Sequence, residues 1–178
     1  MQEKKELRKH IRILKKQLSK EDIKSQTAGV HEKLEQSDLF KKANAVLLYW
    51  AMSDEMPTQS FVNRWYKKKE IYLPVINGDD LKIVRYQGED SLVPGDIYGI
   101  LEPAGVEIDD ETRIDLVIVP GVAFDSQNNR MGRGAGYYDR ILNRIPDAAK
   151  IALAFDIQMV EKVPVEPHDI KMDLVLSK

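Results

Sequence analysis

The sequence of 178 residues contains no cysteine. Disulfide bonds, thiol catalysis and zinc sites built on cysteine are therefore excluded. A large excess of one charge is also missing, because 27 Lys and Arg residues face 29 Asp and Glu residues and the formal net charge is −2. Such a balance gives no broad electrostatic attraction to nucleic acid or to a membrane surface. We expect neither as a partner.

Long apolar runs are missing as well. No run approaches the roughly 20 apolar residues that a helix needs to cross a bilayer. The opening "MQEKKELRKHIRILKK" lacks the apolar centre of a signal peptide. A hydrophobic content of 43% and a charged content of 31% are typical of a globular domain. We therefore expect one domain over residues 1–178, in a cytoplasmic protein.

Hydrophobic periodicity predicts several helices. Apolar residues recur at helical spacing over residues 3–18, which indicates an amphipathic helix. Ser19 and Asp22 form a capping-box pattern at the start of a second helix. Further helices are expected over residues 57–69 and 137–145.

Short apolar runs predict strands between these helices. Pro74 indicates that the end of its strand lies near a sheet edge or a bulge. Asn77-Gly78 predicts a hairpin turn, and residues 87–112 are expected to run over the surface because they are rich in Gly, Pro and Asp. The alternation with helices predicts an α/β fold with a largely parallel sheet, whose loops at the carboxyl ends of the strands carry the function. The predicted strands cover residues 45–51, 70–76, 81–86, 113–120, 150–156 and 173–177.

A glycine-rich stretch, "NNRMGRGAGYYDR" over residues 128–140, is the feature most suggestive of chemistry. Alternate glycines let backbone N–H groups converge into a nest that binds anions. The stretch runs into a predicted helix, whose first N–H groups also favour a phosphate. Arg130 and Arg133 add the fork-shaped donors that suit phosphoryl oxygens. The pattern therefore favours a phosphate site.

Standard nucleotide motifs do not match this stretch. The sequence has no G-x-x-x-x-G-K-[ST], and the glycine spacing differs from G-x-G-x-x-G. A flexible glycine loop with solvated arginines therefore remains the alternative. Asp139, one turn into the following helix, is a hard oxygen ligand of the kind that magnesium prefers beside phosphates.

Several other residues each allow a functional and a structural interpretation. Lys4 and Arg8 share a helix face, where charges are usually solvated. Glu55 follows a buried strand and could accept N–H bonds from a ring edge, although a carboxylate in a loop often faces solvent. Trp50 could stack on a flat ring or pack in the core. Asp169 follows a histidine near the end of the chain, where a role in a turn is the structural alternative.

At this point the residues resemble a known family. "VPGVAFDSQNNRMGRGAGYYDRIL" resembles the signature of the 5-formyltetrahydrofolate cyclo-ligases, also called methenyltetrahydrofolate synthetases. "KKELRKHIR", "LLYWAMSDEMPT" and "VPVEPHDIKMDLVL" are similar to the family's basic first helix, its substrate-side strand and loop, and its ending. Many bacterial members have Tyr in place of Arg133 and Gly in place of Ala135. The resemblance implies a three-layer α/β/α sandwich with a mostly parallel central sheet.

The resemblance also implies a reaction. ATP and 5-formyltetrahydrofolate would give 5,10-methenyltetrahydrofolate, ADP and phosphate, with Mg²⁺ as cofactor. ATP and a reduced folate would be the partners of a monomer. Two other interpretations stay open from the residues alone. One is another ATP-using enzyme, such as a small-molecule kinase, and the other is a non-catalytic module that binds anions or nucleic acid through the basic first helix.

Position by position, the resemblance implies residue roles. Asp139 and Asp169 would hold magnesium, and Arg133 and Tyr137 would be catalytic. The folate would be bound by Trp50, Glu55, Arg133, Gly134, Ala135, Gly136 and Tyr137. ATP would be bound by Lys4, Lys5, Glu6, Leu7, Arg8, Arg130, Met131, Gly132, Arg133, Gly134, Ala135, Gly136, Tyr137 and Tyr138.

Overall fold

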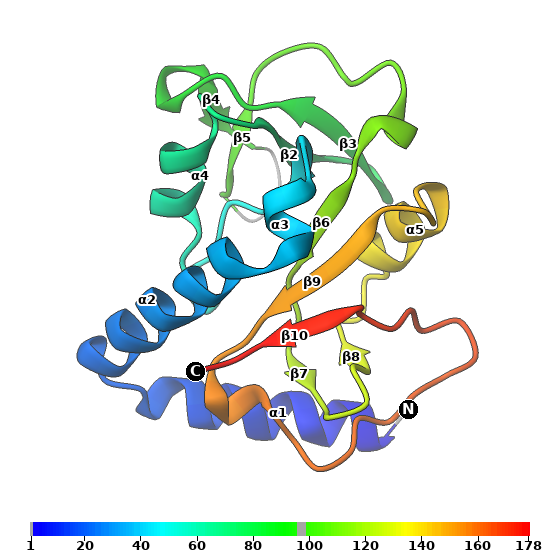
Figure 1. Cartoon of the computed structure of the whole chain (residues 1–178). Helices are drawn as coiled ribbons and strands as arrows, with labels where there is room; N and C mark the ends of the chain where they lie inside the picture. Colours follow the sequence, from blue (N-terminus) through cyan, green and yellow to red (C-terminus); the bar gives the residue numbers. More distant parts are fainter. Residues whose placement is uncertain (1, 96–98) are drawn as a thin grey trace.

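A computed structural model describes residues 2–95 and 99–178 of the protein. Its centre is a six-stranded sheet in the order β10-β9-β6-β1-β2-β3. All neighbouring strands are parallel except the β2–β3 hairpin, so the predicted largely parallel sheet is confirmed (Figure 1). The strands are β1 (Ala45–Leu47), β2 (Glu70–Asn77), β3 (Asp80–Arg85), β6 (Leu116–Val119), β9 (Ala149–Leu153) and β10 (Leu174–Leu176).

Helices cover both faces of this sheet, which confirms the three layers. One face packs against α2 (Lys20–Gln36), α3 (Asp38–Lys42) and α4 (Gln59–Trp65), and the other against α5 (Tyr137–Arg144). Helix α1 (Gln2–Gln17) belongs to neither layer. Figure 1 shows it lying across the end of the sheet towards which β9 and β10 point, where it contacts the segments that follow the strands.

Strand β1 shows why the central strands are apolar throughout. Val46 and Leu48 pack into the cluster beneath α2, α3 and α4, whereas Ala45 and Leu47 pack into the cluster beneath α5. Successive side chains of a strand point to opposite faces, so a strand between two helical layers has no polar side. Burying one large aliphatic side chain stabilises the fold by roughly 1.5–3 kcal/mol. The strand ends at Leu47, earlier than the predicted Ala51.

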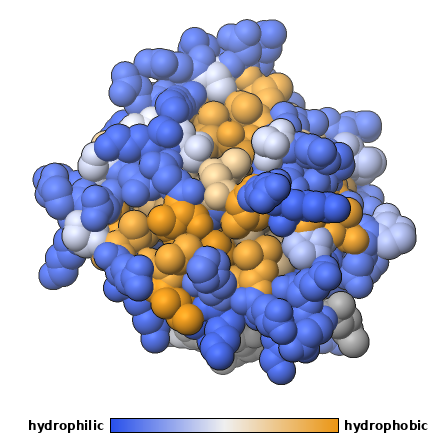
Figure 2. Space-filling view, turned by 90° about the horizontal axis from the view of Figure 1, so that it is seen from below, coloured by the Kyte–Doolittle hydropathy of each residue, from blue (hydrophilic) through white to orange (hydrophobic). Residues whose placement is uncertain are grey.

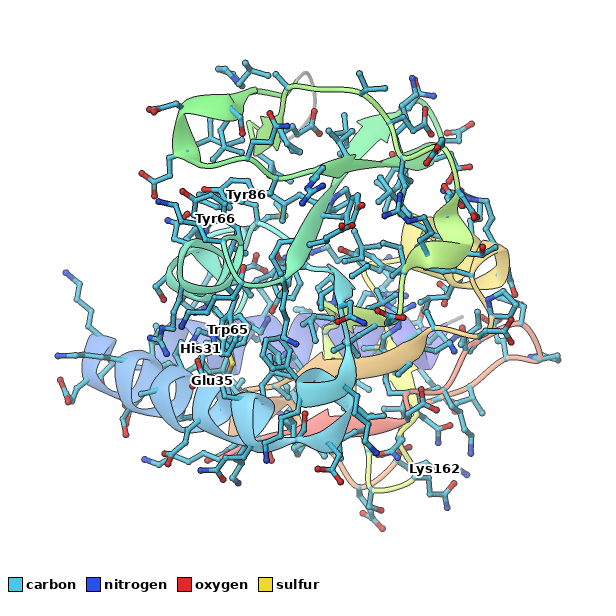
Figure 3. The ribbon with its side chains drawn as sticks, turned by 45° about the horizontal axis from the view of Figure 1, so that its top comes forward. His31, Glu35, Trp65, Tyr66, Tyr86 and Lys162 are labelled. Carbon is cyan, nitrogen blue, oxygen red and sulfur yellow. The ribbon has the colours of Figure 1, made fainter. Side chains whose placement is uncertain are left out.

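The helices begin largely where the sequence indicates. Ser19 Oγ accepts the N–H of Asp22 at 3.0 Å, and Asp22 Oδ2 accepts the N–H of Ser19 at 3.2 Å, so the predicted capping box is formed. Helix α4 is shorter than expected, because the lysines after Trp65 lie in a turn. The indole N–H of Trp65 donates to Glu35 of α2 at 3.0 Å. Figure 3 shows this contact region, with His31 and Glu35 beside Trp65.

The predicted hairpin and its proline agree with the structure. Strand β1 pairs with β2 only from Glu70 to Tyr72, and Pro74 lies beyond that pairing, where β3 is the strand that pairs with β2 among the described residues. The predicted surface segment 87–112 contains an unexpected hairpin, which packs against β2 through its second strand. Residues 96–98 of that segment lie outside the described residues. The hairpin consists of β4 (Leu92–Pro94) and β5 (Leu101–Pro103).

The remaining elements are short. A second unexpected hairpin, β7 (Ala123–Phe124) with β8 (Arg130–Met131), separates β6 from the glycine-rich loop. Single turns of 3₁₀ helix occur at Glu89–Ser91, Glu111–Arg113 and Asp156–Gln158. Within the described ranges, no helix combines the length and the apolar character needed to cross a membrane.

Candidate active site

A cleft opens among the loops that gather near the carboxyl ends of the strands. Its cavity volume is about 150 Å³, the size of an engineered apolar cavity that binds benzene. Figure 2 views the molecule from below and shows apolar surface between hydrophilic residues. The cleft is lined by Tyr49, Trp50, Met52, Glu55, Pro74, Ile76, Leu81, Ile100, Glu102, Pro120, Gly121, Arg130, Gly132, Arg133, Gly134, Ala135, Gly136, Tyr137, Tyr138 and Asp139.

The loop after β1 is tied into shape by side-chain bonds to its own backbone. The hydroxyl of Thr58 donates to Tyr49 O at 2.5 Å and accepts the N–H of Ala51 at 3.1 Å. These bonds draw the chain away from the sheet, which explains the early end of β1. Glu55 Oε2 accepts the N–H of Met52 at 2.9 Å, and only 11% of the Glu55 side chain is exposed. The loop therefore holds one carboxylate against the cleft.

Arg133 of the glycine-rich loop crosses the cleft mouth to this loop. Its Nη2 donates to Asp54 Oδ1 at 2.5 Å and to Glu55 Oε1 at 3.2 Å. Burial opposes ionisation of Asp54, but the bond from Arg133 is enough to lower the pKa of its carboxyl group. Lys15 of α1 donates to the backbone oxygen of Asp54 at 2.7 Å. A phosphate that binds Arg133 must therefore share this guanidinium with two carboxylates, or displace one of them.

The glycine-rich loop has a backbone that needs glycine. Gly134 has φ of +109° and Gly136 has φ of +72°, in the region that disfavours other residues. Arg8 lies against this loop, because its Nε donates to Gly132 O at 2.9 Å and its Nη2 lies 3.5 Å from the place of a Cβ on Gly134. Gly136 precedes α5 without a side-chain cap, so the first N–H groups of the helix receive no cap bond. These are features of an anion site.

The β7–β8 hairpin carries the glycine-rich loop, and Asp125 holds its turn together. The buried carboxylate accepts the N–H groups of Gln127, Asn129 and Val163, each at 3.0 Å. Burial opposes ionisation, but these bonds lower the pKa of Asp125. The sequence interpretation missed this residue. Its signal is a local one, since an Asp followed by "SQNN" is a common way to bond a turn.

Arg130 and Asp139 form an ion pair inside the cleft wall. Only 4% of the Arg130 side chain is exposed, and its Nη2 donates to Asp139 Oδ1 at 2.6 Å. Nη1 donates to Pro120 O at 3.2 Å, while the buried Nε has no partner among the described residues. Two of the predicted ligands, one for phosphate and one for magnesium, are thus bonded to each other.

The other predicted magnesium ligand, Asp169, pairs with Lys4. Lys4 Nζ donates to Asp169 at 2.6 Å and to Glu166 at 2.7 Å. Burial opposes protonation of Lys4, but the two bonds raise its pKa. Oxygen or nitrogen atoms of Glu166, His168 and Asp169 lie within 4.8 Å of one another. Asp139 and Asp169 therefore belong to separate ion pairs, and Asp169 lies outside the cleft lining.

The aromatic candidates line the cleft but differ in how tightly they are packed. Trp50 packs against the core with its ring 5.8 Å from that of Tyr86. The Tyr137 hydroxyl donates to Gly78 O at 3.1 Å, and the guanidinium of Arg140 lies 5.2 Å from its ring. Tyr138 is half-buried and packs against the core, and burial raises the pKa of its hydroxyl. Trp50 and Tyr137 offer ring surface to a bound molecule more readily than Tyr138.

Most, but not all, of the predicted residues meet at the cleft. Leu7 and Met131 pack in the small cluster around Ile11, and Lys5 and Glu6 are exposed on α1. The sequence interpretation missed the wall made by the β2–β3 hairpin and β5. Predicted residues in the lining are Trp50, Glu55, Arg130, Gly132, Arg133, Gly134, Ala135, Gly136, Tyr137, Tyr138 and Asp139. Predicted residues outside it are Lys4, Lys5, Glu6, Leu7, Arg8, Met131 and Asp169.

A second hollow, the α2–α4 groove, lies between those two helices. Its lining includes Lys24, Thr27, His31, Glu35 and Arg64. Thr27 Oγ1 and His31 Nε2 are buried without a partner among the described residues. Burial lowers the pKa of the imidazole, which therefore stays neutral more readily than an exposed histidine. The groove has no glycine-rich loop.

Comparison with known proteins identifies the family of the chain. A model of the 5-formyltetrahydrofolate cyclo-ligase family matches residues 1–178. The chain belongs to the 5-formyltetrahydrofolate cyclo-ligase family. The family resemblance of the sequence is thereby confirmed, and so is its activity: the protein is an enzyme of the 5-formyltetrahydrofolate cyclo-ligase type, a ligase of one-carbon metabolism. Use of ATP follows from the family.

Individual relatives agree with the family match. The 5-formyltetrahydrofolate cyclo-ligase of Mus musculus is 28% identical, covering 96% of this chain and 91% of its own length. The protein of the same name from Escherichia coli strain K12 is 33% identical over 76% of this chain and 78% of its own. The NMR structure of Aquifex aeolicus 5,10-methenyltetrahydrofolate synthetase superposes with a TM-score of 0.86 at 33% identity, covering 97% of this chain and 88% of that one.

Proposed function

We propose that the cleft is the place where 5-formyltetrahydrofolate is cyclised to 5,10-methenyltetrahydrofolate while ATP gives ADP and phosphate. One observation carries this proposal: an apolar cavity sized for a flat ring adjoins a glycine-rich loop at the start of α5. The cavity suits the pterin ring of a folate. The loop suits the phosphates of ATP. Both substrates then meet where Arg133 crosses the cleft.

The phosphates of ATP are proposed to bind the loop from Arg130 to Tyr138 and the start of α1. Arg8 already contacts this loop at Gly132. Lys4 lies one turn earlier on α1, and its ammonium is held by Asp169. Fork-shaped and ammonium donors beside backbone N–H groups neutralise a triphosphate. Arg130 uses one N–H of Nη1 and one of Nη2 for Pro120 and Asp139, so the second N–H of each remains for a phosphate oxygen.

The folate is proposed to lie between Trp50, Glu55 and Tyr137. The two rings offer surface for stacking. The Glu55 carboxylate accepts an N–H group of the ligand, in addition to the bonds that it already receives from Met52 and Arg133. Loss of this carboxylate leaves a ligand donor without a partner.

Magnesium is proposed to be held by Asp139 and Asp169. Each carboxylate has one oxygen that accepts no hydrogen bond from any described residue, since Arg130 uses Oδ1 of Asp139 and Lys4 uses Oδ2 of Asp169. Carboxylate oxygens are the hard ligands that Mg²⁺ prefers, so the chemistry of each of the two side chains suits the ion. When bound, the ion would neutralise phosphate charge and align the phosphoryl group.

The proposed chemistry has two steps. The formyl oxygen attacks the γ-phosphorus of ATP, a new O–P bond forms, and the bond to ADP breaks. N10 of the folate then attacks the activated formyl carbon and loses its proton, and the C–O bond breaks as phosphate leaves. Phosphoryl transfer needs alignment and neutralisation of charge more than a nucleophilic side chain. Arg133 is proposed to neutralise the transferred group and Tyr137 to assist it, which is supported by the presence of both residues in the cleft lining.

A direct assay tests the proposal. Purified protein is mixed with ATP, MgCl₂ and 5-formyltetrahydrofolate, and the near-ultraviolet absorption of the methenyl product is followed together with ADP. We expect both to rise in equal amounts and to require magnesium. ADP without the methenyl product would instead indicate a kinase. A folded protein that forms neither would refute the proposed function.

We further propose that residues 1–178 form a single domain that acts as a cytoplasmic monomer. The three apolar clusters adjoin one sheet and its neighbouring segments, as in a domain with one core. Light scattering coupled to gel filtration measures the mass directly. A mass of twice 20.4 kDa would contradict the monomer.

A further inference from the structure

One wall of the cleft is apolar apart from a single carboxylate. This wall consists of Pro74 and Ile76 of β2, Leu81 of β3, and Ile100 and Glu102 at β5. Only 8% of Glu102 is exposed, and it forms no ion pair with any described residue. A buried carboxylate without a cation is costly unless hydrogen bonds replace its water.

The fold accounts for one of the two Glu102 oxygens. Oε1 accepts the N–H of Ile76 at 3.0 Å. That N–H lies in the half of β2 beyond Tyr72, where β1 no longer pairs with the strand. A glutamine at position 102 would accept the same bond without bringing a charge into an apolar wall. The bond to Ile76 therefore does not explain why a charged glutamate, and not a glutamine, occupies position 102.

The second oxygen of Glu102 has no partner among the described residues. Oε2 accepts no hydrogen bond from them, and Glu102 lines the cleft. A Cβ on Gly95 would lie 2.7 Å from Oε2 and 2.6 Å from Cδ of Glu102. The absence of a side chain at Gly95 thus makes room for the carboxylate.

We propose that Glu102 is a substrate-binding residue whose Oε2 accepts the N–H edge of the pterin ring, formed by the exocyclic amino group and its neighbouring ring nitrogen. This inference rests on the proposed function, since it names a further contact in the same cleft. The apolar side chains around Glu102 cover the ring faces, while the carboxylate meets the one edge that is rich in donors. The sequence interpretation gave a ring edge to Glu55, but Glu55 is already bonded to Arg133, so we assign it an N–H group elsewhere on the folate.

The test is the substitution Glu102→Gln. The amide oxygen still accepts the N–H of Ile76, but the amide NH₂ faces the donors of the ring. We expect the KM for 5-formyltetrahydrofolate to rise about 10–100-fold, the factor for one lost charge-assisted bond. The KM for ATP and the melting temperature stay as in the parent. Glu107→Gln is the matched control, because Glu107 is an exposed carboxylate in the same surface segment, residues 87–112, and lies 3.9 Å from Lys82. It leaves both KM values unchanged.

A folate analogue without the exocyclic amino group separates binding from structure. The parent is expected to bind this analogue at least about tenfold more weakly than the natural ring, whereas Glu102→Gln binds both nearly equally. A parent that binds both compounds equally overturns the proposal without any variant. A Glu102→Gln enzyme with unchanged folate KM, or with equal losses for ATP and folate and a lower melting temperature, overturns it as well. The proposed function is tested separately, by whether the parent enzyme forms the methenyl product.

Discussion

The cleft and the α2–α4 groove both bury polar groups, but they arrange them differently. In the cleft, charged side chains are paired, Arg133 with Glu55 from a segment 78 residues away and Arg130 with Asp139 nine residues along the chain. In the groove, Thr27 and His31 come from one helix and leave buried atoms without partners among the described residues. Paired charges around an open cavity are suited to exchange partners with a ligand. The neutral imidazole of His31, whose ring lies 5.0 Å from that of Phe61, belongs to the core. Substitutions in the cleft should therefore change ligand binding, and those in the groove should change stability.

The largest effect is expected for Gly134→Val. Its φ of +109° disfavours a branched residue, and the new side chain would lie beside Arg8, where backbone must approach phosphate. We expect ATP binding to be lost in calorimetry. Gly29→Ala in α2 is the control, because its Cβ would meet only Lys178 at 3.7 Å, an ordinary contact. A folded Gly134→Val protein with the ATP affinity of the parent would refute the phosphate role of this loop.

A somewhat smaller effect is expected for Lys4→Ala/Arg8→Ala. Each removed cation should cost about 1.5–3 kcal/mol of ATP binding, as for a bond to a charged group. The double variant should lose most of the rise in melting temperature that ATP gives the parent. Lys5→Ala/Lys9→Ala changes two exposed charges on the same helix and should keep this rise. An unaltered ATP-induced shift in Lys4→Ala/Arg8→Ala would remove α1 from the site.

A crossed pair of variants sharpens the comparison inside the cleft. Glu55→Gln should weaken folate binding about tenfold and spare ATP, because it removes the charge that accepts a ligand N–H. Asp139→Asn should raise the magnesium concentration needed for half-maximal rate and spare folate binding. Titration of each ligand against each variant measures both effects. If both variants change both titrations equally, the assigned roles are wrong.

The smallest effect, and one confined to stability, is expected for His31 in the groove. Burial lowers its pKa in the fold, so below the ordinary pKa of about 6.5 the unfolded chain binds more protons than the folded one. The stability that neutral His31 contributes is present above that pH and is lost as the pH falls. The melting temperature of the parent should therefore fall more steeply from pH 7 to 5 than that of His31→Gln.

The control for this pH effect is His10→Gln, since His10 is exposed on α1. This variant should follow the pH curve of the parent. Both variants should keep the parental KM values at pH 7. A loss of activity in a stable His31→Gln protein would contradict the distinction between the groove and the cleft.

Elements with a clear periodic pattern were predictable from the sequence, and very short ones were not. Helix α1 repeats apolar residues at helical spacing, and strand β6 is a continuous apolar run, as expected of a strand buried on both faces. The strands β4, β5, β7 and β8 span only two or three residues each, too few to show alternation. Glu102 lies in β5 and Ile100 directly precedes it. The sequence did not predict this strand, so the cleft wall that contains both residues was missed.

The sequence by itself determined what depends on neighbours along the chain. It determined the α/β alternation, the capping box at Ser19 and the glycine-rich entry to α5, because a period, a cap and a positive φ are local requirements. Only the tertiary structure decided which charges meet. Lys4 and Asp169 are 165 residues apart, and Arg133 and Glu55 are 78 apart. Glu102 reached the cleft through a short hairpin. Such pairings depend on how whole elements pack, and residue spacing carries no record of that packing.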